Sequence, residues 1–234
     1  MKQNRFKKLV SLLLLCCLLL TFPLGALALS FTDVPEGAWF RDDVAFVYEQ
    51  GLMNGLTATS FGPGNNLSRT MLVTILHRMA GEPAASFSPV FSDVVTGRFY
   101  TTAVMWAVQN NIVDGVGDGR FAPADNLTRE QFAVMLHRFA DSQDMDISVP
   151  ATWNLNNFTD HAQISTWAAT ALRWANYNEL ITGVTTTTIV PRGAATRAQG
   201  AAIIHRFVTA FTPLAESPSY ELLPETADYD TQDS

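Results

Sequence analysis

The sequence contains only two cysteines and three lysines, and all five lie within its first 28 residues. The rest of the chain therefore has no disulfide and no thiol chemistry. It has no G-x-S-x-G, HExxH or P-loop motif, so no pattern indicates a hydrolase nucleophile, a metal centre or a nucleotide cofactor. Acidic residues are plentiful, but no motif selects the pair of carboxylates that a glycosidase needs. The sequence does not indicate an enzyme, and it predicts no cofactor.

Positive charge is also scarce in this chain. After residue 28, only 11 arginines face 22 acidic residues, which gives a net charge of −11. Nucleic-acid binding needs a basic face, so this balance argues against a nucleic-acid partner. It argues equally against nonspecific attraction to an anionic polymer. Any binding of an anion must therefore come from local, preorganised sites.

The first 28 residues have the three parts of a secretory signal. Four basic residues precede an apolar run from Leu9 to Leu20, whose 12 residues are too few for a comfortable membrane span. A small-x-small cleavage site ends at Ala28. We predict cleavage after Ala28 and a secreted product with no membrane segment. An uncleaved N-terminal anchor is the alternative.

One unit occurs three times along the chain. Each copy has Phe-x-Asp, a turn that contains glycine, a three-residue motif that ends in proline, and an apolar segment that ends in His-Arg. The proline motif is Phe-x-Pro in the first two copies and Ile-Val-Pro in the third. A unit of this size cannot bury its own core and stacks on its neighbours. The recurring residues are Asp33, Gly55, Pro63, Arg69 and His77; Asp93, Gly115, Pro123, Arg129 and His137; and Asp160, Gly183, Pro191, Arg197 and His205.

This ordered set resembles the S-layer homology (SLH) domain family, whose pattern is F-x-D, a helix with tryptophan, G-[IVL]-x-x-G, F-x-P and T-R-A-E. The likeness covers about residues 31–207. It implies non-covalent anchoring at the cell wall, with a secondary cell-wall polysaccharide as the ligand, commonly one that carries anionic pyruvate ketals. No copy keeps the Glu of T-R-A-E, because the three read SRTM, TREQ and TRAQ.

The copies divide the chain into five segments. Residues 1–28 are the signal peptide, 29–81, 87–141 and 154–208 are repeats 1, 2 and 3, and 209–234 form an acidic tail that we predict to be disordered. Each repeat has two helical patterns joined by a loop, so the predicted fold class is all-α. The resemblance implies that the three helix-loop-helix repeats form a three-pronged bundle around a pseudo-threefold axis. The hydrophobic pattern alone does not choose this bundle over a linear stack.

The second helix of each repeat is predicted to begin after a hydroxyl cap at Ser68, Thr128 or Thr196. A glutamine follows each threonine by three residues and completes a capping box. Met71 occupies that position in repeat 1, so the first box is incomplete. We expect Gly51 just past the end of the first helix of repeat 1.

Each second helix has an arginine in its first turn, at Arg69, Arg129 or Arg197. The helix dipole makes this the unfavourable end for a cation, at a cost of about 0.3–1 kcal/mol. A bound anion removes the conflict, because free N–H groups, the dipole and the guanidinium then converge on one carboxylate. We therefore predict that the three arginines bind the ligand. The alternative is an ion pair with the Asp of a Phe-x-Asp motif.

The recurring aspartates and glycines are further candidates for the ligand site. Asp33, Asp93 and Asp160 suit either an Asx-turn or cap, or a hydrogen bond to sugar hydroxyls. The glycines provide either a positive φ or a close approach of the backbone, which can include approach to a sugar. These glycines are Gly55, Gly115 and Gly183.

The recurring histidines and aromatics favour structural roles. His137 lies one step off the apolar stripe and near a helix C-terminus, which favours a partial positive charge over a metal ligand. We therefore predict no metal site. Phe46, Trp106 and Trp174 have helical spacing that favours the core over contact with a sugar.

We expect a secreted carbohydrate-binding module at the cell wall and cell surface. Its sites should be unequal, with Arg129 most secure, because repeat 2 matches the pattern best. One alternative is a structural protein that self-assembles or docks a surface-protein partner through its C-terminal tail. A wall-lytic enzyme with an unrecognised pair of carboxylates is a third.

Overall fold

A computed structural model describes residues 29–211 of the chain and contains no β-strand in that range. The prediction of an all-α fold is confirmed. The signal peptide and residues 212–234 of the tail lie outside the described residues, and α7 runs three residues past the expected end of repeat 3. Within residues 29–211 the α-helices are α2 (Arg41–Glu49), α3 (Arg69–Met79), α4 (Thr101–Gln109), α5 (Arg129–Ser142), α6 (Ala169–Tyr177) and α7 (Arg197–Phe211). Two 3₁₀ turns precede α6, η1 (His161–Gln163) and η2 (Thr166–Ala168).

The predicted helix ends are confirmed. Thr128 and Gln131 form a reciprocal capping box at the start of α5. Thr196 and its glutamine do the same at α7, whereas Ser68 accepts one bond, from the N–H of Met71. Gly51 has a φ of 67° just after α2, the left-handed conformation expected of a glycine that ends a helix.

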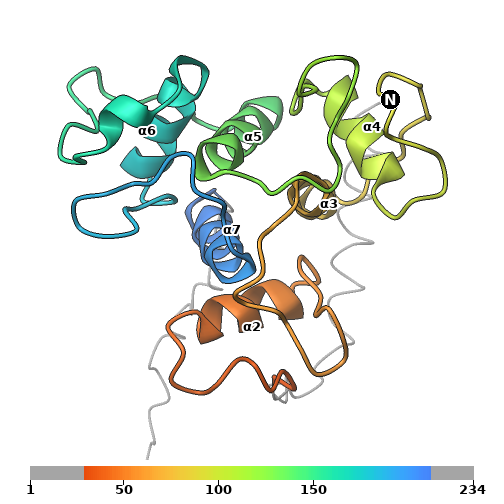
Figure 1. The fold of residues 1–234 in the computed structure, drawn as a ribbon, viewed down its shortest axis with the longest axis horizontal. Coiled ribbons are helices and arrows are strands. Elements are labelled where there is room, and N and C mark those ends of the chain that lie inside the picture. The colour runs from red at the N-terminus through yellow and green to blue at the C-terminus, as the bar shows by residue number, and fades with distance from the viewer. Residues whose placement is uncertain (1–28, 212–234) are drawn as a thin grey trace, which may run out of the picture.

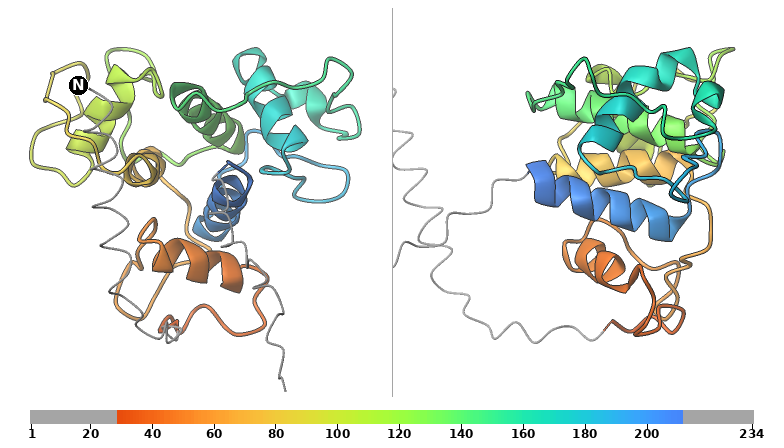
Figure 2. Two further views of the ribbon diagram at one scale, coloured as in Figure 1. Left: turned by 180° about the vertical axis from the view of Figure 1, so that it is seen from behind. Right: turned by 90° about the vertical axis from the view of Figure 1, so that its left-hand side faces the viewer.

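The first helix of each repeat packs on the second helix of the preceding repeat and not on that of its own. Helix α4 contacts α3, α6 contacts α5, and α2 contacts α7, which brings the first and last repeats together. Figure 1 shows the result as three lobes around α3, α5 and α7. A second view places the same three helices side by side at the centre (Figure 2). Every lobe is therefore built from two repeats.

A closed cycle of backbone hydrogen bonds joins the three repeats just before α3, α5 and α7. The N–H of Leu67 donates to Ala195 over 2.9 Å, that of Ala195 to Leu127 over 2.9 Å, and that of Leu127 to Leu67 over 2.8 Å. Each donor and acceptor lies in a different repeat. These bonds fix the three helix starts relative to one another.

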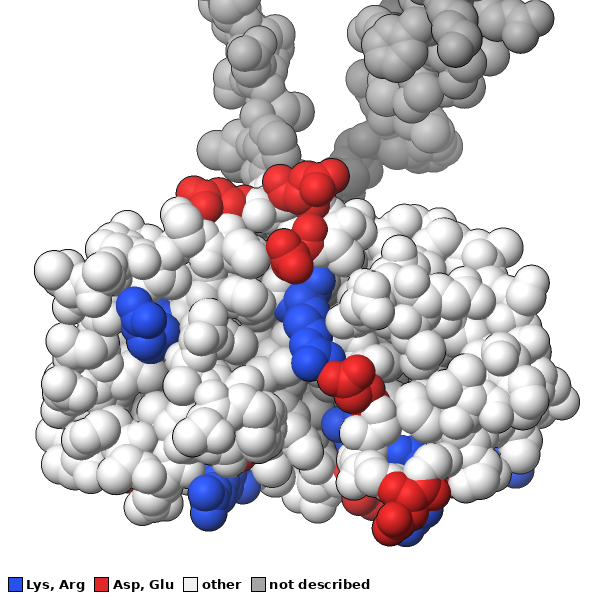
Figure 3. Space-filling view, turned by 90° about the horizontal axis from the view of Figure 1, so that it is seen from above, with Lys and Arg blue, Asp and Glu red and all other residues white. Residues whose placement is uncertain are grey.

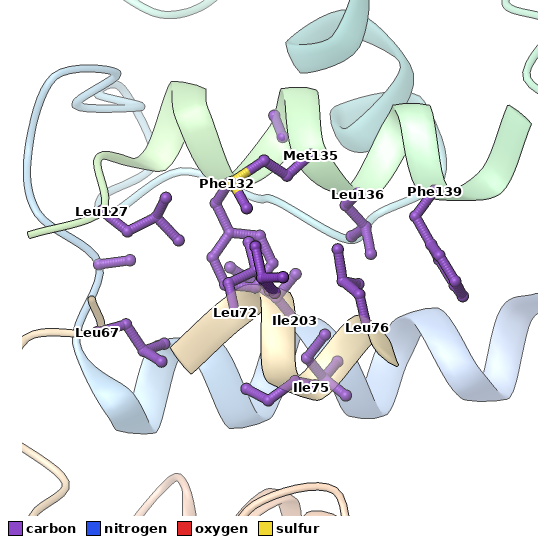
Figure 4. Packing of buried hydrophobic residues seen from close by; sticks show 14 of the residues in the cluster. Leu67, Leu72, Ile75, Leu76, Leu127, Phe132, Met135, Leu136, Phe139 and Ile203 are labelled. Carbon is purple, nitrogen blue, oxygen red and sulfur yellow. The ribbon is translucent and has the colours of Figure 1, made fainter. Parts of the chain in front are cut away.

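Apolar side chains fill the space between the three central helices. Leu72, Phe132 and Leu136 have no exposed surface, and Ile203 of α7 reaches the same cluster (Figure 4). No repeat could bury such a face alone, so the cluster and the backbone cycle depend on all three copies. No helix within residues 29–211 has the length and apolar character needed to cross a bilayer.

Candidate functional site: arginine-floored grooves

The three recurring arginines are buried. Arg69, Arg129 and Arg197 expose only 6%, 5% and 5% of their surface, although each lies in the first turn of its helix. Each side chain reaches into the loop of the next repeat and donates to two backbone carbonyls there. Nε donates to Phe121, Ile189 and Phe61, respectively, over 2.8–2.9 Å, and Nη2 donates to Asp114, Thr182 and Asn54 over 2.6–2.9 Å.

The backbone N–H groups at the same helix starts are also occupied. The N–H groups of Arg69, Arg129 and Arg197 donate to carbonyls of the neighbouring loop over 2.8–3.1 Å. The predicted convergence of free N–H groups on an anion is therefore wrong. Carbonyl oxygens of the next repeat supply the negative partial charge instead, and they remove the conflict between the cation and the helix dipole. The arginines thus hold one repeat to the next.

The Phe-x-Asp carboxylates form no ion pair with these arginines among the described residues. Asp33 instead accepts the N–H groups of Phe61 and Gly62, both over 2.8 Å, within its own repeat. Burial opposes ionisation of this carboxyl, but the backbone donors outweigh it and lower its pKa. The same arrangement, with the same lowered pKa, occurs at Asp93 and Asp160. Each aspartate therefore shapes the loop whose carbonyl receives an arginine.

The recurring glycines are explained by close packing. Gly55, Gly115 and Gly183 do not have positive φ angles, so that half of the expectation is wrong. A Cβ on Gly115 would lie 2.8 Å from the ring of Phe91 and 2.7 Å from the carbonyl oxygen of Arg120. Because the other two glycines face the equivalent Phe ring in the same way, the Phe-x-Asp motif and the glycine belong to one packed unit.

Grooves open beside these units, over the buried arginines. A groove of about 400 Å³ has the buried Arg69 as its floor and is lined by Gly115 and Val116 of the repeat 2 loop and by Gln131 and Arg138 of α5. A second groove, of about 260 Å³, repeats the plan one repeat later. Its corresponding residues are Arg129, Gly183, Val184, Gln199 and Arg206.

A space-filling view of the molecule from above shows how charged side chains are distributed on this face (Figure 3). Basic side chains lie along a furrow between two largely uncharged lobes, and acidic side chains flank them. This local concentration of arginine stands out on a chain whose overall charge is negative. Positive charge also occurs in separate patches elsewhere on this face.

Each groove also has a large aromatic residue that our sequence interpretation missed. Trp167 lines the Arg69 groove and Trp39 lines the Arg129 groove. Their exposed fractions are 57% and 65%, and the equivalent Phe99 is 74% exposed. A signal was present, because an aromatic residue follows the Asp of each Phe-x-Asp motif by six or seven positions. The tryptophans of the first helices, Trp106 and Trp174, are buried in the core as predicted.

The arginine on the groove floor has one donor nitrogen that makes no hydrogen bond within residues 29–211. Nε and Nη2 of Arg69 and Arg129 bind carbonyls, and within residues 29–211 their Nη1 atoms have no recorded partner. Burial lowers the pKa of Arg129 to about 10, with a further lowering by Arg206 and an opposite effect of Asp160. The side chain is therefore charged at neutral pH. Such a floor can donate to a carboxylate or to a hydroxyl.

The three recurring histidines do not meet. His77 bonds the carbonyl of Pro83 over 2.8 Å, and His205 bonds Asp43 over 2.8 Å. His137 packs edge-on against Trp174, and its pKa is lowered by burial. Within residues 29–211, no group of three or more His, Cys, Asp or Glu side chains is arranged to hold a metal ion.

Comparison with known proteins places these features in context. Residues 30–69, 90–133 and 157–201 match the family model described as S-layer homology domain. The chain is 30% identical over 214 residues to an endoglucanase of Bacillus sp. (strain KSM-635), a match that covers 87% of this chain and 22% of that protein.

Two further relatives are named as a different enzyme and as an S-layer protein. An amylopullulanase of Thermoanaerobacterium thermosulfurigenes is 28% identical over 75% of this chain and 9% of its own length. An S-layer protein of Bacillus thuringiensis subsp. finitimus is 26% identical over 64% of this chain and 18% of its own length. The chain thus spans 22% or less of each of these three relatives.

Proposed function

The chain belongs to the S-layer homology domain family, and we propose that its grooves anchor it to the cell wall by binding an anionic saccharide of the wall polysaccharide. S-layer homology domains are anchoring modules of cell-surface proteins, and this is a cell-surface chain. The ligand, its charge and the residues that hold it are the proposal. Pyruvate ketals are the form of negative charge that the resemblance implies.

A buried cation that keeps one donor nitrogen for the solvent side carries the proposal. Arg129 is 95% removed from solvent, yet it lines an open groove. Desolvation strengthens the attraction of such a cation for an anion, because water no longer screens it fully. The two carbonyl bonds hold the guanidinium in place, so little ordering is left for the ligand to impose.

The walls of the groove suit a sugar ring. The exposed indole of Trp39 offers a flat apolar surface, and backbone and the glutamine side chain of Gln199 line the same groove. Small-ligand sites commonly combine apolar surface with a few convergent polar groups. A carboxylated sugar presents both a ring face and an anionic group, and it therefore matches this combination.

A pull-down on purified cell walls tests the proposal. Wild-type protein should bind intact walls and should not bind walls from which the polysaccharide has been extracted. A Trp39→Ala/Phe99→Ala/Trp167→Ala protein should lose binding and keep its melting temperature. Phe87→Ala is the matched control, because Phe87 is 42% exposed and lies outside the described grooves.

Two results would count against the proposal. Equal binding to extracted and intact walls would exclude the polysaccharide as the ligand. Unchanged wall binding by the triple aromatic variant would move the site away from the grooves.

A further inference from the structure

The three arginine-floored sites are not chemically equivalent. We propose that the Arg129 groove alone accepts an anionic ligand, because Asp114 opposes anions in the Arg69 groove and Met71 covers the arginine of the third site. This inference rests on the proposed function and assigns it to one place, between the loop and second helix of repeat 3 and Trp39 of repeat 1.

The Arg69 groove contains its own anion. Asp114 lies 2.6 Å from the Nη1 atom of Arg138, and both residues line the groove. The pair neutralises the rim arginine, and the exposed carboxylate would face a ligand of like charge. Juxtaposed like charges are a common means of rejecting a wrong ligand. Thr182 occupies the equivalent position in the Arg129 groove, where no acidic residue lines the walls.

In the third site, Nη1 of the buried arginine is in contact with another side chain. Nη1 of Arg197 lies 4.0 Å from the sulfur of Met71, which replaces the glutamine of the other two repeats. Its rim arginine, Arg78, also has partners of its own. Nη1 donates to the carbonyl of Leu52 over 3.0 Å, and Nε lies 3.8 Å from Glu82.

The Arg129 groove has two arginines, and neither forms a salt bridge with an acidic residue within residues 29–211. Arg206 makes one long bond, of 3.4 Å, to the carbonyl of Leu180. Asp160 is the acidic group that acts on Arg129, but both of its carboxylate oxygens accept backbone N–H groups. Arg129 and Arg206 both line this groove, so an anion bound there meets two guanidinium groups.

Calorimetric titration with a synthetic pyruvylated hexosamine disaccharide tests this assignment, with the same disaccharide lacking the ketal as the uncharged probe. Wild-type protein should bind about one equivalent of the pyruvylated probe. Thr182→Asp places the opposing carboxylate in the Arg129 groove, and it should weaken that binding at least about tenfold. Thr182→Ser is the matched control and should bind as wild type. Asp114→Thr should create a second binding equivalent.

Each outcome separates the inference from the function on which it rests. Two or three equal sites in the wild-type protein, or full affinity in Thr182→Asp, would overturn the assignment to one groove and leave wall anchoring intact. Equal binding of the two disaccharides would overturn the choice of an anion. Absence of binding of either disaccharide, in a protein that still binds intact walls, would overturn both the assignment and the anionic ligand.

Discussion

The buried arginines and the exposed aromatics recur in all three repeats, but they differ in exposure and in hydrogen bonding. Arg197 is 5% exposed and donates to the carbonyls of Phe61 and Asn54 in another repeat. Trp39 is 65% exposed and donates no recorded hydrogen bond within residues 29–211. The arginine floor is therefore part of the framework, whereas the aromatic rim can change without disturbing it.

This contrast separates two reasons for a residue to recur in a repeat protein. One residue recurs because every interface between repeats needs it, and another because every groove presents it to a ligand. Under the proposed function Arg129 belongs to both classes, since it binds two carbonyls and lines the groove. Replacing Arg129 would therefore change stability and binding together. Arg197 is the better residue for testing stability alone, and Trp39 is the better residue for testing binding alone.

The largest expected effect is on folding, in Arg197→Ala. The change leaves the carbonyls of Phe61 and Asn54 without their donor at the interface that joins the last repeat to the first. We expect the free energy of unfolding to fall by about 3 kcal/mol, and the melting temperature to fall by roughly 10 °C. Thermal and urea unfolding measure both quantities.

Arg192→Ala is the control for this experiment, because Arg192 is an exposed arginine of the same loop. It should stay within about 0.5 kcal/mol of wild type. Arg197→Lys should restore little stability, since an ammonium group cannot reproduce the fork of two bonds. An unaltered melting temperature in Arg197→Ala would show that the arginine is not part of the framework.

Gly115→Ala should have the next largest effect on stability. The added Cβ would meet the carbonyl oxygen of Arg120 at 2.7 Å and the ring of Phe91 at 2.8 Å, so backbone must move. Overpacking of this kind costs about 1–3 kcal/mol. Gly37→Ala should be close to neutral, because nothing lies within 4 Å of its added Cβ. Equal unfolding midpoints of the two variants would contradict the packing argument.

The loop aspartates should make the protein acid-sensitive. The pKa values of Asp33, Asp93 and Asp160 are lowered in the folded state, so their contribution to stability is complete above the ordinary carboxyl pKa of about 4. It is lost as the pH falls through the lower, folded-state values. Urea unfolding from about pH 5 to pH 2 should show this decline. Asp93→Asn should be less stable at neutral pH and show a shallower decline, and an equally steep decline would argue against Asp93 as a source.

The smallest effect on folding is expected for Trp39→Ala. The side chain is mostly exposed, so the free energy of unfolding should change by less than about 0.5 kcal/mol. Binding of the pyruvylated disaccharide should nevertheless fall by about fivefold or more, as for an aromatic anchor of a binding site. Trp39→Phe should retain most of the affinity. A Trp39→Ala protein with a clearly lower free energy of unfolding but wild-type affinity would reverse the roles of floor and rim.

Local patterns in the sequence were enough to predict the helices. The caps at Ser68, Thr128 and Thr196 and the glycine after α2 are where the sequence places them, because such bonds join residues only a few positions apart. The predicted difference between the complete and incomplete capping boxes is also present. The recurrence of the unit and the family to which it belongs were readable for the same reason, since both are properties of order along the chain.

The partners of the arginines were decided only by the tertiary structure. A cation at a helix start is unfavourable unless a group with negative charge or partial charge lies beside it. The sequence alone allows that group to be an anion, an aspartate or a backbone carbonyl. In the folded protein the carbonyls lie 45 to 143 residues away, and they reach the arginines only because each first helix packs on the preceding repeat. Residues and their spacing thus determined the helices and the repeat. The closed arrangement of the three repeats decided what each buried charge contacts, because burial and long-range hydrogen bonds exist only after the chain has closed on itself.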